Sequence, residues 1–122
     1  YASLFRSLYN ASYLNREMSQ QALELLAEVQ FSYGIEGGVP EGIVTAHKFG
    51  YLETKDTENQ LHDCGIIYAP QFPYLLCVMT RGDDTGEITS IMAEISHDIY
   101  AEVSTRNDDS VSASDGPSEG NL

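Results

Sequence analysis

Basic residues are scarce in this sequence. Six lysines and arginines stand against nineteen aspartates and glutamates, so the 122 residues carry a formal net charge of −13. A nucleic-acid-binding protein needs a basic face to neutralise phosphates, and an anionic lipid surface repels an acidic chain. We therefore expect no nucleic-acid partner and no membrane partner. No stretch of the sequence is long and apolar enough to span a bilayer.

Cysteines are also few. Cys64 and Cys77 are the only two, and they do not form a Cys-x-x-Cys motif. Two cysteines cannot build a disulfide framework, and their spacing does not suit a metal site, so we expect no metal and no cofactor. Each could be a small buried hydrophobic residue. Alternatively they form a cross-strand pair, because a turn at Pro70 and Gln71 would place position 64 opposite position 77.

The sequence also lacks an initiator methionine and a visible signal peptide. It starts at Tyr1 and enters a helical pattern directly. We expect a trimmed or partial chain, in which case the missing signal carries no information about compartment.

The pattern of apolar residues predicts two helices, three strands and a third helix. Residues 1–12 have helical spacing, and Asn15 is suited to cap a second helix with Glu17 in its first turn. The buried stripe predicted for that second helix consists of Met18, Ala22, Leu25, Leu26 and Val29. A glycine-rich loop over residues 31–42 then leads into the strands.

The predicted strands cover residues 43–49, 64–69 and 74–80, with a polar turn over 51–61. The third, Tyr74 to Thr80, is apolar at consecutive positions, which favours a strand buried on both faces inside a sheet. Asp84 and Glu87 form a capping box for the last helix, and apolar residues repeat at helical spacing up to Val103. Together these elements predict an α+β fold, an antiparallel meander with helices packed on it.

Composition changes at residue 104, where Ser, Asp, Gly and Asn become dominant. Apolar residues nearly disappear, and such a segment cannot bury enough surface to fold. We expect one folded domain over residues 1–103 and an acidic, disordered tail over residues 104–122.

The most informative motif is Lys48-Phe49-Gly50, followed by Tyr51, at the end of the first predicted strand. A lysine is a compact charge whose basicity responds to desolvation, and a glycine allows another backbone to approach closely. The simpler interpretation is a solvated lysine at a strand end, since most lysines lie in water.

Four other polar residues are interpreted as structural. His47 and His62 lack the spacing of metal ligands, so hydrogen-bonded structural roles are favoured over a paired site. Asp63 is expected to tether a strand end or turn, and His97 to lie at the surface or the boundary of the last helix.

The segments Ile43–Gly50, His62–Tyr68 and Tyr74–Thr80 together resemble the C-terminal half of the class A β-lactamase-like serine hydrolases. That superfamily includes the D-alanyl-D-alanine peptidases and other penicillin-binding proteins. The helix over 15–26, the loop over 35–42 and the closing helix are similar as well. The family has three motifs, Ser-x-x-Lys, Ser-Asp-Asn and Lys-Thr-Gly. Only the third has a counterpart here, Lys48-Phe49-Gly50, and no Ser-x-x-Lys is present.

The resemblance implies a role for each residue of this motif. Lys48, as the catalytic residue, would lie near the substrate carboxylate and the proton network of the nucleophile. Gly50 would let the substrate backbone approach, and the backbone N–H of Tyr51 would be one oxyanion donor. Phe49 departs from the usual Thr or Ser, whose hydroxyl contacts the substrate carboxylate. It could stack on an apolar substrate group, or it could mark a lost β-lactam specificity.

The implied function is part of a serine acyl-transfer hydrolase acting on a D-alanyl peptide or a β-lactam. This chain would supply one wall of the site. A missing N-terminal segment of the same domain would supply the nucleophile, so the chain alone should be inactive. Extracytoplasmic location, in the periplasm, in the cell wall or secreted, is implied as well. In the family the last strand pairs with a strand of the N-terminal part, so an open edge at Tyr74–Thr80 invites self-association.

Two alternatives stay open. The chain could be a catalytically inactive β-lactamase-like module that serves binding or a cell-wall scaffold, an alternative that Phe49 slightly favours. It could also be an unrelated small α+β interaction domain with an accidental likeness.

Overall fold

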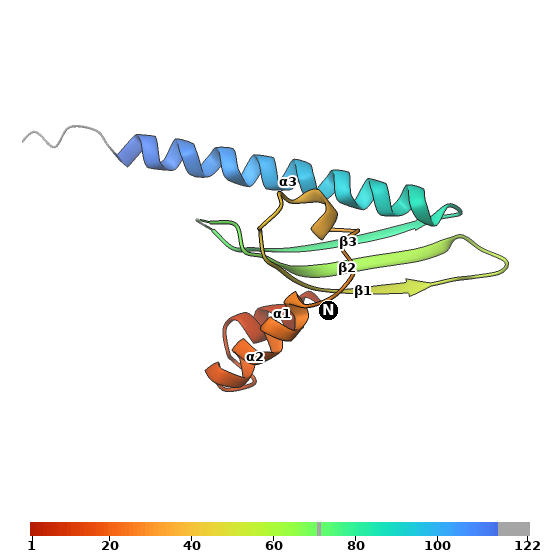
Figure 1. Ribbon diagram of the computed structural model, residues 1–122, viewed down its shortest axis with the longest axis horizontal. Helices are drawn as coiled ribbons and strands as arrows, with labels where there is room; N and C mark the ends of the chain where they lie inside the picture. Colours follow the sequence, from red (N-terminus) through yellow and green to blue (C-terminus); the bar gives the residue numbers. More distant parts are fainter. Residues whose placement is uncertain (71, 115–122) are drawn as a thin grey trace, which may run out of the picture.

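A computed structural model describes residues 1–70 and 72–114 of the chain. It confirms an α+β fold with an antiparallel sheet of three strands (Figure 1). In chain order the elements are α1 (Ala2–Tyr9), α2 (Arg16–Ala27), the short 3-10 helix η1 (Glu36–Gly38), β1 (Thr45–Leu52), β2 (Asn59–Ile67), β3 (Tyr74–Gly82) and α3 (Thr85–Ser114).

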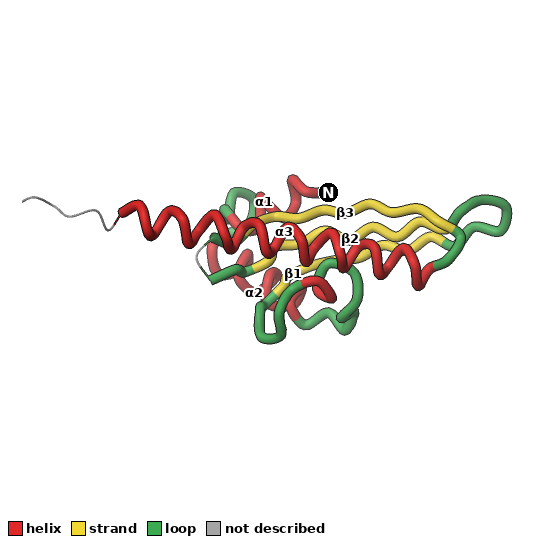
Figure 2. The backbone as a smooth tube through the Cα atoms, turned by 90° about the horizontal axis from the view of Figure 1, so that it is seen from above, coloured by secondary structure: helices red, strands yellow, loops and turns green. Residues whose placement is uncertain are grey.

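The molecule has three layers. The sheet has the order β1-β2-β3, with both neighbouring pairs antiparallel. The long helix α3 runs along one face, while α1 and α2 lie against the other (Figures 1 and 2). The loop that carries η1 turns back over the α3 face, so that η1 packs beside α3.

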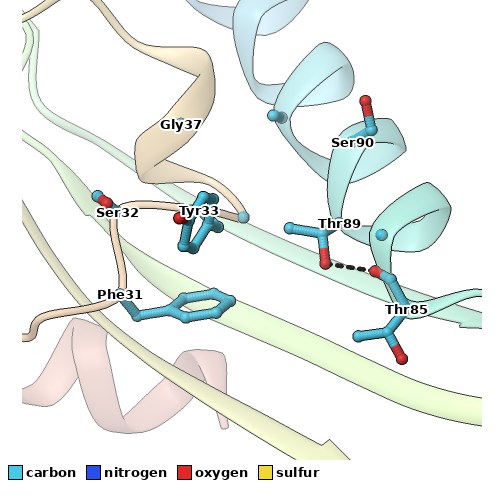
Figure 3. A pocket seen from close by; sticks show the side chains of 10 residues that line it. Phe31, Ser32, Tyr33, Gly37, Thr85, Thr89 and Ser90 are labelled. Atoms are coloured by element: carbon cyan, nitrogen blue, oxygen red, sulfur yellow. Dashed lines mark hydrogen bonds between the residues drawn. The ribbon is translucent and has the colours of Figure 1, made fainter.

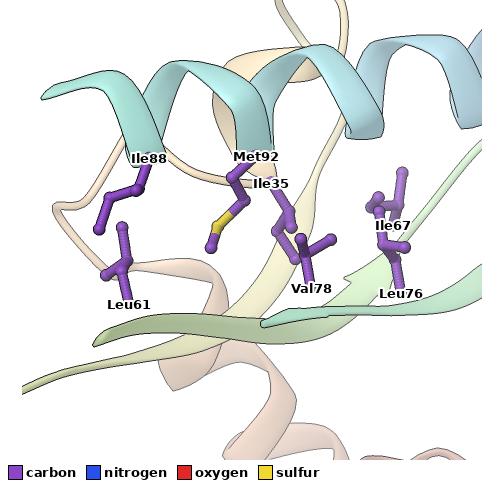
Figure 4. Packing of buried hydrophobic residues seen from close by; sticks show 7 residues of the cluster. All are labelled: Ile35, Leu61, Ile67, Leu76, Val78, Ile88 and Met92. Carbon is purple, nitrogen blue, oxygen red and sulfur yellow. The ribbon is translucent and has the colours of Figure 1, made fainter. Parts of the chain in front are cut away.

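Each face of the sheet has its own apolar cluster. Figure 4 shows that side chains of the strands, of Ile35 and of α3 meet on the α3 face. This cluster consists of Ile35, Leu61, Ile67, Leu76, Val78, Ile88 and Met92. The opposite face buries Phe5, Leu8, Leu23, Ala46, Cys64 and Ile66. Because side chains alternate along a strand, neighbouring residues of β2 and β3 serve different clusters.

The strands are in the predicted order, but all three are longer than the predicted runs. β1 continues to Leu52 and β2 begins at Asn59, so the hairpin extends well into the segment predicted as a polar turn. Cross-strand backbone pairing maintains a strand there, and Leu61 of this extension is buried in the cluster under α3.

The prediction that residues 74–80 are buried on both faces is wrong for the described residues. In the described part of the chain, β3 is an edge strand that pairs with β2 alone. Leu76 and Val78 are buried against α3, whereas Cys77 is exposed and Met79 is 76% exposed on the opposite face. The run of apolar residues therefore reflects an uncovered face.

Both predicted helix caps are confirmed. The side chain of Asn15 accepts a hydrogen bond from the Met18 amide at 2.8 Å, and that of Asp84 accepts one from the Glu87 amide at 3.1 Å. The predicted stripe of α2 is only partly right, because Met18 and Leu25 are exposed while Ser19 and Leu23 face the core.

The chain after residue 103 also differs from the expected disorder. α3 continues to Ser114, and residues 115–122 lie outside the described part. Two contacts support the first turn beyond Val103: Thr105 donates to the Ala101 carbonyl at 2.9 Å, and Arg106 donates to Glu102 at 2.7 Å. With no Gly or Pro between 104 and 114, a formed helix can propagate further than composition suggests.

The two cysteines lie directly opposite each other in β2 and β3 and are joined as a disulfide. Of the two interpretations of Cys64 and Cys77, the structure agrees with the cross-strand pair. The pair lies on the face that α1 and α2 cover only in part, with Cys64 buried and Cys77 exposed.

Candidate active-site wall

The direction of the β1 backbone decides which of its polar groups are free. The Tyr68 amide donates to the Val44 carbonyl at 2.9 Å, so residues 44 and 68 are a hydrogen-bonded pair of the ladder. Bonded and non-bonded pairs alternate along an antiparallel ladder. The even-numbered residues of β1 therefore bond to β2. The N–H and C=O groups of Phe49 and Tyr51 face away from it, at the edge that has no partner strand within the described residues.

Lys48 lies at this open edge. Its Cα pairs with Cys64, and its side chain is exposed. The ammonium donates to the outward-facing carbonyl of Phe49 at 2.7 Å and lies 4.7 Å from the centre of the Phe49 ring. Tyr1 donates to the Lys48 carbonyl at 3.4 Å. The ammonium and the free Tyr51 amide thus share one edge of β1.

Phe49 points to the α3 face and is already stacked within the chain. Its ring centre lies 4.1 Å from that of Phe31, with 24° between the planes. On the same face the Tyr51 hydroxyl is 3.2 Å from that of Thr85 at the start of α3. Of the two roles considered for Phe49, stacking on a substrate must therefore compete with Phe31.

His47 and Asp63 form a buried pair beneath the motif. His47 Nδ1 lies 3.0 Å from both carboxylate oxygens of Asp63, and both residues are 1% exposed. Asp63 also accepts the Ile35 amide at 3.2 Å, and Ser96 of α3 donates to the Ile35 carbonyl at 2.6 Å. Glu36 Oε2 lies 3.5 Å from His47 Nε2. The expected structural roles of His47 and Asp63 agree with this geometry.

Two glycines make this arrangement possible, and their role could not be found in the sequence. A Cβ at Gly65 would lie 2.6 Å from the Ala46 carbonyl oxygen and would clash with His47. A Cβ at Gly34, where φ is +66°, would lie 2.7 Å from Asp63 Oδ2. Both positions require the absence of a side chain, because buried backbone and a carboxylate fill the space. The cross-strand register reveals this requirement at Gly65, and the packing of the loop against Asp63 reveals it at Gly34.

The face that carries Lys48 contains a hollow of about 340 Å³. Gly50 opens onto it, since no atom lies within 4 Å of the position a Cβ would take. The hollow is lined by Tyr1, Gly50, His62, Asp63, Cys64, Cys77, Val78 and Met79. Its walls are mostly apolar and sulfur-containing.

A second hollow, of about 650 Å³, lies on the other face between the loop 31–37 and the start of α3 (Figure 3). Phe31 and Tyr33 form one wall, and Thr85, Thr89 and Ser90 form the other. Phe31 also stacks on Phe49. Among the residues that the structure describes, no charged side chain lines this hollow, so it is the less suitable of the two for acid–base chemistry.

Two other kinds of feature are absent from the described residues. No group of three or more His, Cys, Asp or Glu residues in residues 1–70 and 72–114 is arranged to hold a metal ion. Over the same residues, no helix combines the length and apolarity needed to cross a bilayer. His97, predicted at the surface, is 72% exposed on α3.

Comparison with known proteins gives a family and a fold. The model of the β-lactamase enzyme family matches residues 1–103. Among solved structures, a variant of the TLA-1 extended-spectrum β-lactamase is 23% identical with a TM-score of 0.74, covering 84% of this chain and 39% of that one. PBP-A is 16% identical with a TM-score of 0.71, covering 85% and 38%.

A class A β-lactamase from Bacteroides cellulosilyticus is likewise 16% identical, with a TM-score of 0.74 and coverage of 85% and 40%. This chain therefore spans about two fifths of the length of these structures. No match to a curated protein sequence was found.

Proposed function

Because the chain belongs to the β-lactamase enzyme family, we propose that it is the C-terminal part of a serine acyl-transfer hydrolase and forms one wall of its active site. One observation carries this proposal. The Lys48 ammonium, the open backbone at Gly50 and the outward-facing amide of Tyr51 lie together along the free edge of β1. An acyl-transfer cleft needs a charge, room for the substrate backbone and a preorganised oxyanion donor.

The chemistry would proceed through an acyl-enzyme. A serine supplied by a segment N-terminal to this chain attacks the substrate carbonyl, and its proton passes to a base. The tetrahedral oxyanion accepts a hydrogen bond from the Tyr51 backbone N–H. The amine of the substrate then leaves with a proton, and a water molecule hydrolyses the acyl-enzyme to release the acid. Lys48 holds the anionic group of the substrate and stabilises the proton network around the serine.

The same N-terminal segment is the proposed partner of the uncovered sheet face. Tyr1, Met79 and Leu4 are 67%, 76% and 55% exposed, and exposed apolar patches mark interaction sites. The Cys64–Cys77 disulfide supports the proposal of an extracytoplasmic location, because disulfides persist in oxidising compartments.

The substrate is proposed to be a D-alanyl peptide or a β-lactam. A variant of PBP-A has been captured as an acyl-enzyme complex with penicillin G, and it shares this fold. Phe49 favours the peptide, since its ring is engaged with Phe31 and it has no hydroxyl to offer a β-lactam carboxylate.

The test uses the protein extended by the segment that precedes Tyr1 in its gene. A fluorescent penicillin should label the extended wild type covalently, and Lys48→Ala should slow labelling about a hundredfold or more. Lys55→Ala is the matched control, because Lys55 lies in the exposed connection after β1. If labelling is absent while a D-alanyl thioester is hydrolysed, the substrate is a peptide. If neither reaction occurs, the hydrolase proposal fails.

A catalytically inactive binding or cell-wall scaffold module is the second candidate. The Phe31–Phe49 stack favours it, because the pair occupies the place at the motif where a polar contact would be made. An extended protein that binds peptidoglycan fragments but turns over neither substrate would support this candidate.

A further inference from the structure

The hollow between the loop 31–37 and α3 takes no part in the proposed acyl-transfer site, because it lies on the face of the sheet away from Lys48. Its volume of about 650 Å³ is that of a small-molecule pocket. Two aromatic rings on the loop face hydroxyl-bearing side chains on the helix (Figure 3). Ligand sites combine aromatic surface with a few polar groups in this way.

Both walls of this hollow are attached to the same strand. On the loop side, the Phe31 ring stacks on Phe49 with 4.1 Å between the ring centres. On the helix side, the Thr85 hydroxyl lies 3.2 Å from the Tyr51 hydroxyl. Phe49 and Tyr51 are two residues apart in β1, so they project to one face of the sheet. The sheet therefore fixes the separation of the two walls, and a ligand finds a preorganised site.

The loop wall is anchored by Asp63. Its carboxylate accepts the Ile35 amide at 3.2 Å, and Gly34, with φ of +66°, leaves room for the same carboxylate. Tyr33 directly precedes this anchored glycine. The Tyr33 side chain is nevertheless 65% exposed, and it meets the Phe31 ring edge to face with the ring centres 5.9 Å apart. Tyr33 thus presents a largely uncovered ring from a fixed backbone.

The chemistry of the walls selects the class of ligand. Because the described residues of the hollow include no charged side chain, an ionic ligand would find no counter-charge there. The net charge of −13 further disfavours an anion. Ser32, Tyr33 and Ser90 are exposed, and each of their hydroxyls can donate and accept hydrogen bonds. A sugar ring matches these walls, since it has hydroxyls around its rim and C–H groups on its face that pack on an aromatic ring.

We propose that this hollow binds an uncharged pyranose sugar, which stacks on Tyr33 and forms hydrogen bonds with hydroxyls of the loop and of α3. The site goes beyond the acyl-transfer proposal and uses neither Lys48 nor Gly50. Through Phe31 and Thr85, the sugar lies beside the strand that carries the motif but on the opposite face of the sheet. Sugar binding and acyl transfer can therefore be lost separately.

The test uses the protein extended by the segment that precedes Tyr1. It is titrated with triacetylchitotriose and, separately, with cellotriose while aromatic and amide NMR resonances are recorded. At least one sugar should shift Tyr33 and Ser90, and the pair of probes distinguishes an N-acetylated sugar from a plain hexose. Tyr33→Ala should weaken binding about tenfold, whereas Tyr33→Phe keeps the ring and should retain most of the affinity. Tyr13→Ala removes an 86% exposed ring between α1 and α2 as the matched control.

A second variant tests the helix wall. Ser90→Ala keeps a good helix former at an exposed position of α3, and it should weaken binding severalfold while the circular dichroism spectrum stays unchanged. The proposal is overturned if neither sugar binds, if Tyr33→Ala and Tyr13→Ala have equal effects, or if choline binds in place of the sugars.

The proposal can fail independently of the hydrolase function. Lys48→Ala should leave the affinity for the sugar unchanged. Sugar binding without penicillin labelling or thioester hydrolysis would count against the hydrolase alone, whereas labelling without sugar binding would count against the sugar site alone.

Discussion

His47 Nδ1 lies 3.0 Å from both carboxylate oxygens of Asp63, and the two side chains are almost completely buried. The contact joins the strand of Lys48 to β2. Through the Ile35 amide and the Ser96 hydroxyl it also reaches the loop before β1 and α3. The position of Lys48 at the edge of β1 therefore depends on contacts from β2, from the loop before β1 and from α3.

We expect Asp63→Ala to destabilise the chain by about 3 kcal/mol or more, because it leaves the His47 imidazole and the Ile35 amide buried without an acceptor. Chemical denaturation followed by circular dichroism measures this loss. Asp98→Ala removes the acidic partner of the exposed His97–Asp98 pair and should change stability by less than about 0.5 kcal/mol. Similar small effects of both changes would contradict the structural role of Asp63.

Two glycines of the hairpin should respond in opposite ways to alanine. Gly65→Ala forces a methyl group against His47 and the Ala46 carbonyl, and we expect a loss of about 1–3 kcal/mol or more from overpacking. Gly50→Ala meets open space and should leave the melting temperature nearly unchanged. In the extended protein, however, it should impair substrate binding. A tolerated alanine at position 65 would contradict the described register.

Stability should fall in strong alkali because of Tyr74. Burial of the phenol, with a smaller contribution from Tyr100, raises the pKa of Tyr74 from 10.0 to about 12. A raised folded-state pKa means that the contribution to stability is complete below pH 10 and is lost as pH rises toward 12. Tyr74→Phe should reduce the loss in this window, measured by urea unfolding at a series of pH values. Tyr13→Phe removes an exposed phenol and should leave the loss in place.

The Cys64–Cys77 disulfide should be detectable by mass spectrometry and should contribute to the stability of the chain. Reduction and alkylation should convert one intact species into a doubly alkylated one in mass spectrometry. Because the bond closes a loop with a sequence separation of 13, replacing both cysteines by serine should lower stability by about 3 kcal/mol. Free thiols in protein isolated without reductant would contradict this assignment.

The outer edge of β3 should promote self-association of the isolated chain. In the described ladder the backbone groups of Leu75, Cys77 and Met79 face away from β2, and open edges of this kind pair with other strands. We expect sedimentation to detect dimers at high concentration, and Met79→Lys to suppress them. Leu25→Lys adds the same charge on an exposed position of α2 as a control. A wild type that stays monomeric at high concentration would rule out this contact.

Element order, both helix caps and the pairing of positions 64 and 77 could be predicted from the sequence, because each depends on local spacing. Burial could not be predicted so well. The apolar run 74–80 gave no indication that Met79 would be uncovered, since hydropathy does not report which layers are present beside the sheet. The continuation of α3 past Val103 depended on the helix already formed before it, which composition does not describe.

Only part of the candidate site could be recognised from the sequence. Lys48, Gly50 and Tyr51 were identified through a motif, but the free direction of the Tyr51 amide follows from the hydrogen-bond parity of the β1–β2 ladder. The Phe31–Phe49 stack and the position of His62 opposite Gly50 join residues that are 18 and 12 positions apart. Such pairs become neighbours only when the register is fixed, and the sequence contains no signal that fixes it.

The backbone N–H and C=O groups of β1 point alternately toward β2 and away from it, and this alternation limits where residues can be inserted or deleted. Removing or adding one residue between Val44 and Tyr51 would exchange the inward and outward groups, so the ammonium and the free amide would leave the edge together. The connection from residue 53 to 58 lies beyond the last described pair, Leu52 with Gln60, and can vary in length without altering that alternation. Homologous sequences should therefore show insertions and deletions at the hairpin tip and none within β1, while the side chain at position 51 varies freely.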